Sequence, residues 1–212
     1  MKRIIEVVDY DPGWIAAFEK EAAILNAIFG ERVVDLHHIG STSVPGLDAK
    51  PIIDILVVLD NTDDINSFDR AMENVGYRVR GECLDAPVPG TPGRFYFSKE
   101  TNDVRSHHVH VCARGHSEIL DKLAFRDYLR AHSSKATAYG ELKRRIAAQY
   151  RFDNLGYMHA KDDFVKSTLV EARRWYAERL WRFSTPIRNP RFGAADSNDW
   201  TMFRIIAGTD LE

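Results

Sequence analysis

The residue types that could do chemistry gather in one stretch, HIGSTSVPGLDAKPIIDILVVL, which runs from residue 38 to residue 59. A small polar turn at Gly40 and Ser41 comes first, and a single carboxylate, Asp54, lies within the apolar second half. A lone ionised acid is costly to bury unless a cation, a metal or several hydrogen-bond donors meet it. The stretch therefore raises the question of what compensates Asp54.

The polar turn suits a phosphate group. Glycine lets the backbone approach a ligand closely, and the Ser41 hydroxyl adds a donor. Lys50 stands four residues before Asp54 and could bind a phosphate as a point charge or pair with Asp48. An ordinary turn at the end of a strand has the same composition, so Gly40 and Ser41 alone do not identify a ligand.

A second stretch, SHHVHVC, offers two imidazoles. Alternation along a strand directs His108 and His110 to one face and the intervening valine to the other. Such a pair can bind one metal, and suits Zn²⁺, Mn²⁺ or Fe²⁺ better than Mg²⁺. Together with Asp54 the histidines could form a metal site, or they could simply donate hydrogen bonds that satisfy the acid. Both interpretations stay open at this point.

Periodic patterns predict the elements that must position these residues. Residues 52–59 are β-branched and apolar on both faces, which is typical of a central strand covered on both sides. A proline- and glycine-rich loop is predicted at residues 85–93. The same reasoning predicts helices at 12–29 and 62–75 and strands at 32–39, 77–82, 94–99 and 105–113, the last two as a hairpin.

The C-terminal half has a different character, with helical patterns and many charges at residues 117–132, 134–151 and 157–179. Mixed strands followed by helices predict an α+β fold. Residues 181–212 are irregular, and only TMFRIIA resembles a strand. We therefore expect a domain over residues 1–180 and an extension that folds back on it or contacts another subunit.

Bulk composition excludes several classes of protein. A chain of 212 residues is long enough for one well-packed domain, and its net charge of -2 argues against a nucleic-acid-binding surface. No apolar stretch is long enough to cross a bilayer, and the N-terminus lacks the apolar segment of a secretory signal. Two cysteines without a CxxC pattern favour reduced thiols, so we expect a cytoplasmic protein.

Four stretches taken in order, HIGSTSVPGLDAKPIIDILV, RSHHVHV, FRDYLRAH and GYMHAKDDFV, make the chain resemble the GrpB family over residues 1–178. The resemblance implies the fold of the nucleotidyltransferase superfamily: a mixed sheet with flanking helices, here with a helical C-terminal half. In that superfamily a Gly-Ser turn precedes a strand with an Asp-x-Asp pair, and a third acid lies on a neighbouring strand.

The chain departs from that pattern around Asp54. Two-metal nucleotidyl transfer needs paired carboxylates, but Ile52 and Leu56 stand two residues to either side. By the resemblance, the histidine strand occupies the place of the third acid. We therefore expect Asp54, His108 and His110 to be the catalytic residues and to hold a divalent metal (Mg²⁺, Mn²⁺ or Zn²⁺).

The C-terminal motifs contribute further candidate ligands for a nucleotide. Tyr157 and Lys161 are spaced to share a helix face, which suits stacking a base and holding a triphosphate. Arg126 is a similar candidate, and Lys143 is another helical cation. A solvated surface is the ordinary place for a helical lysine, but matches to the family motifs set Lys161 and Arg126 above that background.

These observations predict a nucleotide-binding, metal-dependent nucleotidyl- or phosphoryltransferase of unknown acceptor. Two alternatives are a non-catalytic nucleotide-binding accessory module, favoured by the broken acid pair, and a metal-dependent hydrolase, favoured by the two histidines. The expected ligand is a nucleotide or another phosphorylated small molecule. GrpB-like domains also occur fused to dephospho-coenzyme A kinase, so the resemblance implies a link to coenzyme A synthesis.

Overall fold

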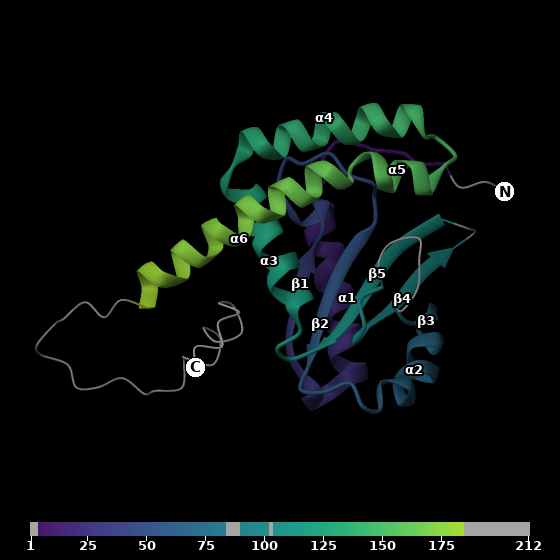
Figure 1. The fold of residues 1–212 in the computed structure, drawn as a ribbon. Coiled ribbons are helices and arrows are strands. Elements are labelled where there is room, and N and C mark those ends of the chain that lie inside the picture. The colour runs from purple at the N-terminus through teal and green to yellow at the C-terminus, as the bar shows by residue number, and fades with distance from the viewer. Residues whose placement is uncertain (1–3, 84–89, 102–103, 185–212) are drawn as a thin grey trace, which may run out of the picture.

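A computed structural model of the chain describes residues 4–83, 90–101 and 104–184, and it has an α+β architecture (Figure 1). The strands of the described part form one mixed sheet of five strands in the order β1-β2-β5-β4-β3, with helices on its two faces. The predicted fold class is therefore confirmed. The strands are β1 (Val33–Ile39), β2 (Ile53–Leu59), β3 (Tyr77–Glu82), β4 (Arg94–Thr101) and β5 (Val104–Ala113).

The centre of the sheet sets the relation between the acid and the histidines. Strands β2 and β5 are parallel neighbours, whereas the other strand pairs are antiparallel. In this register Asp54 stands beside His108, and Leu56 stands beside His110. Because side chains alternate along a strand, these four residues point to the same face of the sheet. The expected adjacency of the two motifs is confirmed.

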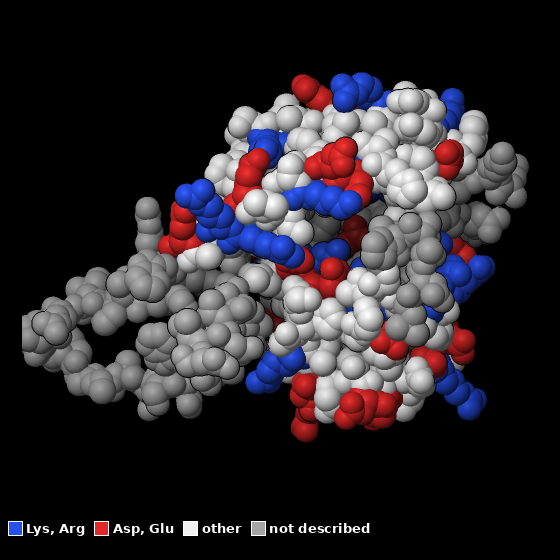
Figure 2. All heavy atoms as spheres, viewed as in Figure 1, with Lys and Arg blue, Asp and Glu red and all other residues white. Residues whose placement is uncertain are grey.

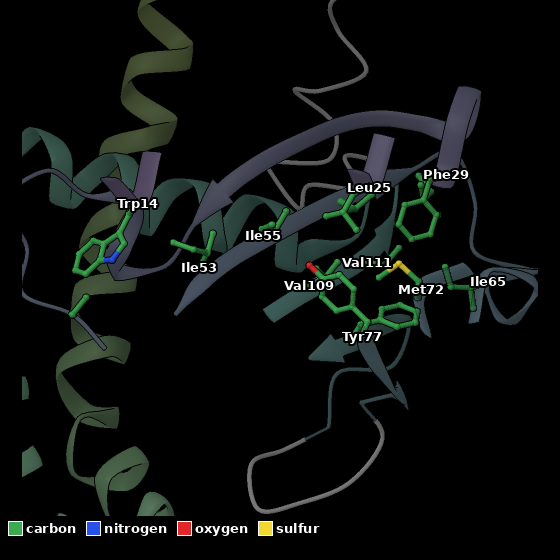
Figure 3. Packing of buried hydrophobic residues seen from close by; sticks show 14 residues of the cluster. Trp14, Leu25, Phe29, Ile53, Ile55, Ile65, Met72, Tyr77, Val109 and Val111 are labelled. Atoms are coloured by element: carbon green, nitrogen blue, oxygen red, sulfur yellow. The ribbon is translucent and has the colours of Figure 1, made fainter. Parts of the chain in front are cut away.

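The opposite face of the sheet carries the main hydrophobic core. Odd-numbered residues of β2 and β5 pack there against α1 (Gly13–Phe29) and the short α2 (Asp69–Asn74). Figure 3 shows this packing from close by, with Ile53 and Ile55 facing the helical residues. The labelled members are Trp14, Leu25, Phe29, Ile53, Ile55, Ile65, Met72, Tyr77, Val109 and Val111.

The face that bears Asp54 is covered by the helical C-terminal half. Helix α3 packs on β1 and β2, where Leu123 meets Ile39 and Leu56. Helices α4 and α5 lie across one end of the sheet, and α6 returns along α3 (Figure 1). The bounds are α3 (Ser117–Ala131), α4 (Ser133–Gln149), α5 (Asn154–Ala160) and α6 (Asp162–Ser184).

Two helical predictions were wrong in detail. The segment at 62–75 forms a 3-10 turn (Ile65–Phe68) before α2 instead of one helix. The predicted helix at 157–179 is two helices, α5 and α6, which meet at Lys161. Asp153 caps α5 by accepting a hydrogen bond from the Gly156 amide, and the acidic first turn of α6 favours a second start.

Several predictions lie outside the described residues. They include the strand-like TMFRIIA segment, the rest of the extension beyond Ser184, and most of the loop at 85–93. Within the described residues, no helix is long and apolar enough to cross a membrane.

Candidate functional site

The turn after β1 fits closely over Asp54. Gly40 has a φ of 70°, which favours glycine, and it leads into a 3-10 turn at Ser41–Ser43. The Ser43 hydroxyl donates a hydrogen bond of 2.6 Å to the Gly40 carbonyl oxygen. A Cβ on residue 40 would lie 2.9 Å from Cγ of Asp54. The glycine therefore allows the turn to rest directly against the acid.

Asp54 is compensated mainly by a histidine on the neighbouring strand. Nδ1 of His108 donates a hydrogen bond of 2.9 Å to Oδ1 of Asp54, whose side chain remains 29% exposed. Burial alone would raise the pKa of Asp54, but this bond and nearby imidazole and ammonium groups hold it below its usual range. The acid is therefore an ionised carboxylate with an accessible edge.

His110 plays a different part from His108. Its ring stacks on Tyr96, with 5.3 Å between the ring centroids. Burial lowers the pKa of His110 to about 3, so the ring is neutral near pH 7. Nδ1 of His110 and Nε2 of His108 are buried and have no hydrogen-bond partner among the described residues.

The arrangement does not fit a metal centre built from the protein alone. Asp54, His108 and His110 share a face as expected, but the ring nitrogen nearest the acid is used in a direct hydrogen bond. Across the described ranges, no group of three or more histidine, cysteine or acidic side chains is placed to hold a metal ion. This geometry favours the alternative in which His108 satisfies Asp54.

A buried lysine comes from α4. The Lys143 side chain is on a residue only 3% exposed, and its Nζ donates a hydrogen bond to the main-chain oxygen of Asp48. Nζ also lies 4.6 Å from the centroid of the Tyr139 ring. Burial, with the nearby charges of Lys161 and Lys50, lowers the pKa of Lys143 to about 7.

Two more lysines approach the acid from other elements. Lys50 precedes β2, and its Nζ lies 5.0 Å from the centroid of the Tyr157 ring. Lys161 stands at the break between α5 and α6. Burial lowers the pKa of Lys161, and the negative charge of Asp54 partly offsets this effect. We call Lys50, Lys143 and Lys161 the lysine cluster.

The surface above the sheet is hollowed. Figure 2 shows a depression between the helical layer and the lower part of the molecule, with basic and acidic atoms on its walls. Charged groups in a depression act more strongly on a ligand than they would on an open surface, because the surrounding low-dielectric protein focuses their field. The hollow is thus a candidate site for a charged small molecule.

Two residues predicted to touch a nucleotide have other roles in this structure. Arg126 donates to the main-chain oxygen of His38 at 3.1 Å and pairs with Asp127 at 2.7 Å, so its guanidinium fastens α3 to the end of β1. Tyr157 is only 1% exposed and its ring lies beneath Lys50, which leaves no open face on which a base could stack.

Lys143 was not among the predicted ligand-binding residues, although the helical pattern around it indicates that it is buried. Its neighbours on one face of α4 are the buried Ala136, Tyr139, Gly140 and Ala147. A lysine at the centre of such an apolar stripe is not on the solvated face. The helical spacing of these apolar neighbours therefore identifies Lys143 as a buried cation.

The fold and the site together define an α+β domain with a glycine turn over a single carboxylate. The model of the GrpB protein family matches residues 4–171, so the chain belongs to the GrpB family, as its motifs indicated. The UPF0157 protein YqkA of Bacillus subtilis is 40% identical over 174 residues. That match covers 82% of this chain but only 49% of YqkA, so the chain spans about half the length of this relative.

A solved structure of a GrpB protein is similar to this chain. The crystal structure of the conserved protein GrpB from Enterococcus faecalis has a TM-score of 0.74 and 39% identity, and the match covers 81% of this chain and 99% of that one. The Cid1 poly(U) polymerase matches more weakly, with a TM-score of 0.42, 15% identity, and coverage of 65% and 45%. Dephospho-CoA kinase of Mycobacterium leprae is 24% identical, over 83% of this chain and 48% of the kinase.

Proposed function

We propose that the hollow lies beside Asp54 and the lysine cluster, and that this chain binds there the phosphate groups of a nucleotide or of another phosphorylated small molecule. The observation that supports the proposal is the lysine cluster, which brings cations from three separate elements toward one carboxylate. An excess of positive charge in a partly desolvated hollow favours a polyanion.

The turn over Asp54 supports the same ligand class. Among the described residues the Ser41 hydroxyl has no hydrogen-bond partner, and Ser41 is partly exposed. With Gly40 beside it, a phosphate can approach the backbone closely and accept a hydrogen bond from the hydroxyl. Arg130 stabilises the turn by donating a hydrogen bond of 2.7 Å to the Ser43 carbonyl oxygen.

Binding without chemistry, as an accessory module, is the function that the geometry supports best. Asp54 has no second acid two residues away along the chain, because Ile52 and Leu56 occupy those positions. Nucleotidyl or phosphoryl transfer is a second candidate, which the ionised and partly exposed Asp54 favours. In that case its carboxylate would accept the proton of an acceptor hydroxyl.

The names of some relatives suggest one class of ligand. The similarity to dephospho-CoA kinases supports a link to coenzyme A synthesis, in which a precursor of coenzyme A or a nucleotide would be the phosphorylated ligand. Both compounds carry phosphate groups of the kind that the lysine cluster would bind. A competition experiment between them therefore compares their affinities directly.

Incubation of the chain with radiolabelled nucleoside triphosphates tests the proposal. We expect labelled nucleotide to be retained by the parent chain and recovered unchanged, and Lys161→Met to retain much less. Pyrophosphate together with a new labelled adduct would instead establish transfer, and free phosphate alone would establish hydrolysis. Failure to retain any nucleotide would contradict the proposal as a whole.

A further inference from the structure

The charge balance around Asp54 is the reverse of the balance in a two-metal site. Such a site gathers carboxylates, whose negative charge attracts divalent cations to the phosphates. Here the three lysines of the lysine cluster act on a single carboxylate, that of Asp54. The protein thus supplies at this place the positive charge that metal ions supply elsewhere.

Within the described residues, the acids that act on Lys143 and Lys161 offset the positive charge of these two lysines only in part. Asp48 and Asp162 both act on the lysine cluster, but each also pairs with a different cation. The carboxylate of Asp48 accepts from Arg144, and that of Asp162 pairs with Lys166 at 2.6 Å. Asp48 and Asp162 are therefore shared with other cations and balance the charge of Lys143 and Lys161 only in part.

Burial makes this excess costly unless something compensates it. Lys143 is 3% exposed, and its ammonium group contacts a main-chain oxygen and the Tyr139 ring, while the carboxylates of Asp48 and Asp54 act on it only through their charge. An ammonium group loses hydration on burial, and neutral partners replace it only in part. A bound anion would supply the missing counter-charge.

From these contacts we infer that the lysine cluster holds phosphate groups in place of a divalent metal, so the site takes the metal-free phosphoanion. Lys50 and Lys161 are partly exposed and can contact the ligand. Lys143 is buried and acts on the ligand only through its charge. The inference rests on the proposed function, because it names the form in which the phosphorylated ligand binds.

The role of Asp54 follows from this account. Its carboxylate attracts the lysine cluster toward the hollow, but it also repels the phosphates of a ligand. Asp54→Asn keeps the shape and an oxygen that can accept from His108, and removes the negative charge. In a lysine-based site this change strengthens anion binding. In a metal-based site the same change removes the metal ligand and abolishes binding.

Calorimetric titration with inorganic tripolyphosphate, in EDTA and again in excess Mg²⁺, tests the inference. We expect the parent chain to bind in EDTA, with Mg²⁺ giving no tighter complex, and Asp54→Asn to bind about threefold tighter or more. Lys161→Met should weaken binding about tenfold, because one close charge pair is lost. The matched control is Lys135→Met, on the same helix as Lys143, where Lys135 pairs with Glu171 at 2.8 Å.

Each result is decisive. Tighter binding by Asp54→Asn in EDTA supports the inference. Binding that needs Mg²⁺ and disappears in Asp54→Asn overturns it but leaves the proposed function standing. Absence of binding by the parent chain in both buffers overturns the proposed function as well. Lys143→Met, checked for folding by circular dichroism, should also bind more weakly, and unchanged binding in this variant and in Lys161→Met would overturn the inference.

Discussion

Gly40 and Asp54 fit together so closely that a Cβ on residue 40 would lie 2.9 Å from both Cβ and Cγ of the acid. Real Cβ atoms do not approach their neighbours this closely, so one of the two residues would have to move. The glycine therefore has two functions, because it adopts a φ of 70° and leaves space for the carboxylate. This contact ties the polar turn to the acid.

The first prediction separates these two functions with a pair of glycine variants. Gly40→Ala should destabilise the chain by about 1–3 kcal/mol for backbone strain, plus a steric cost from Asp54. Gly30→Ala is the matched control, because Gly30 has a φ of 58° and nothing within 4 Å of its added Cβ. Urea unfolding should show the larger loss for Gly40→Ala. Equal losses would mean that the contact with Asp54 is unimportant.

The second prediction concerns acid stability. His110 has a folded pKa of about 3 and an ordinary value of 6.5, so the unfolded chain binds a proton first as the pH falls. Stability contributed by the neutral ring is complete above pH 6.5 and declines below it, by about 2 kcal/mol between pH 7 and pH 5. His110→Phe, which keeps an aromatic ring beside Tyr96, should flatten this decline in urea unfolding.

In His110→Phe, part of the decline in stability at low pH should remain, because burial lowers the pKa of His38 to about 4 as well. The matched control is His159→Gln, because His159 is exposed on α5 and this change should leave the decline intact. An unchanged decline in His110→Phe would show that the ring is not buried in its neutral form.

The third prediction concerns the free energy of unfolding at neutral to alkaline pH, where Lys143 changes its charge. Lys143 has an ordinary pKa of 10.5 and a folded value of about 7, so between these values the unfolded chain binds more protons. Stability in phosphate-free buffer should therefore rise with pH, by about 2 kcal/mol from pH 7 to pH 8.5. In Lys143→Met this rise should be smaller, with a remainder from Lys161, whose pKa burial also lowers. Stability at pH 7 should stay equal or increase, because a costly buried charge is gone.

Stability gained together with weaker phosphate binding would identify Lys143 as a residue that serves function at the expense of the fold. Lys135→Met, at a position that is 28% exposed, is the control and should keep the rise. A large loss of stability in Lys143→Met at every pH would show that the lysine is a structural residue.

Much of the fold could be predicted from local patterns. The strand at 52–59 is a continuous apolar run and the helix at 12–29 has a clear helical period, and each agrees with the structure within a residue or so. The break at Lys161 could not be predicted in this way, because the helical pattern continues through it. The acidic first turn of α6, with Asp162 and Asp163, favours the start of a new helix directly after Lys161.

The candidate site also combines features that local patterns predict with features that they do not. Alternation and strand adjacency suffice to place His108 beside Asp54, because both are regular properties of a sheet. The partner of Arg126 is a main-chain oxygen 88 positions away, and the chain folds Lys143 toward Lys50 over a comparable separation. Such long-range contacts depend on how the helical half sits on the sheet, which no local pattern specifies.

The fourth prediction tests the domain boundary. A chain that ends after Leu180 should fold with a melting temperature within about 3 °C of the parent. We expect this because α6 packs on α3 through residues before Leu180. Ala172 is fully buried, and Arg173 pairs with Asp121 of α3 at 2.6 Å. Differential scanning calorimetry checks this expectation. Aggregation, or a clearly lower melting temperature, would show that later residues belong to the packed unit.

The most direct test of phosphate binding in the hollow is a calorimetric titration of the chain with nucleoside triphosphates. The account predicts saturable binding by the parent chain, a clear loss in Lys161→Met, and parent-like binding in Lys135→Met, whose lysine pairs with Glu171 away from the lysine cluster. Absence of saturable binding by the folded parent with every nucleotide, both with and without a divalent metal, would contradict it.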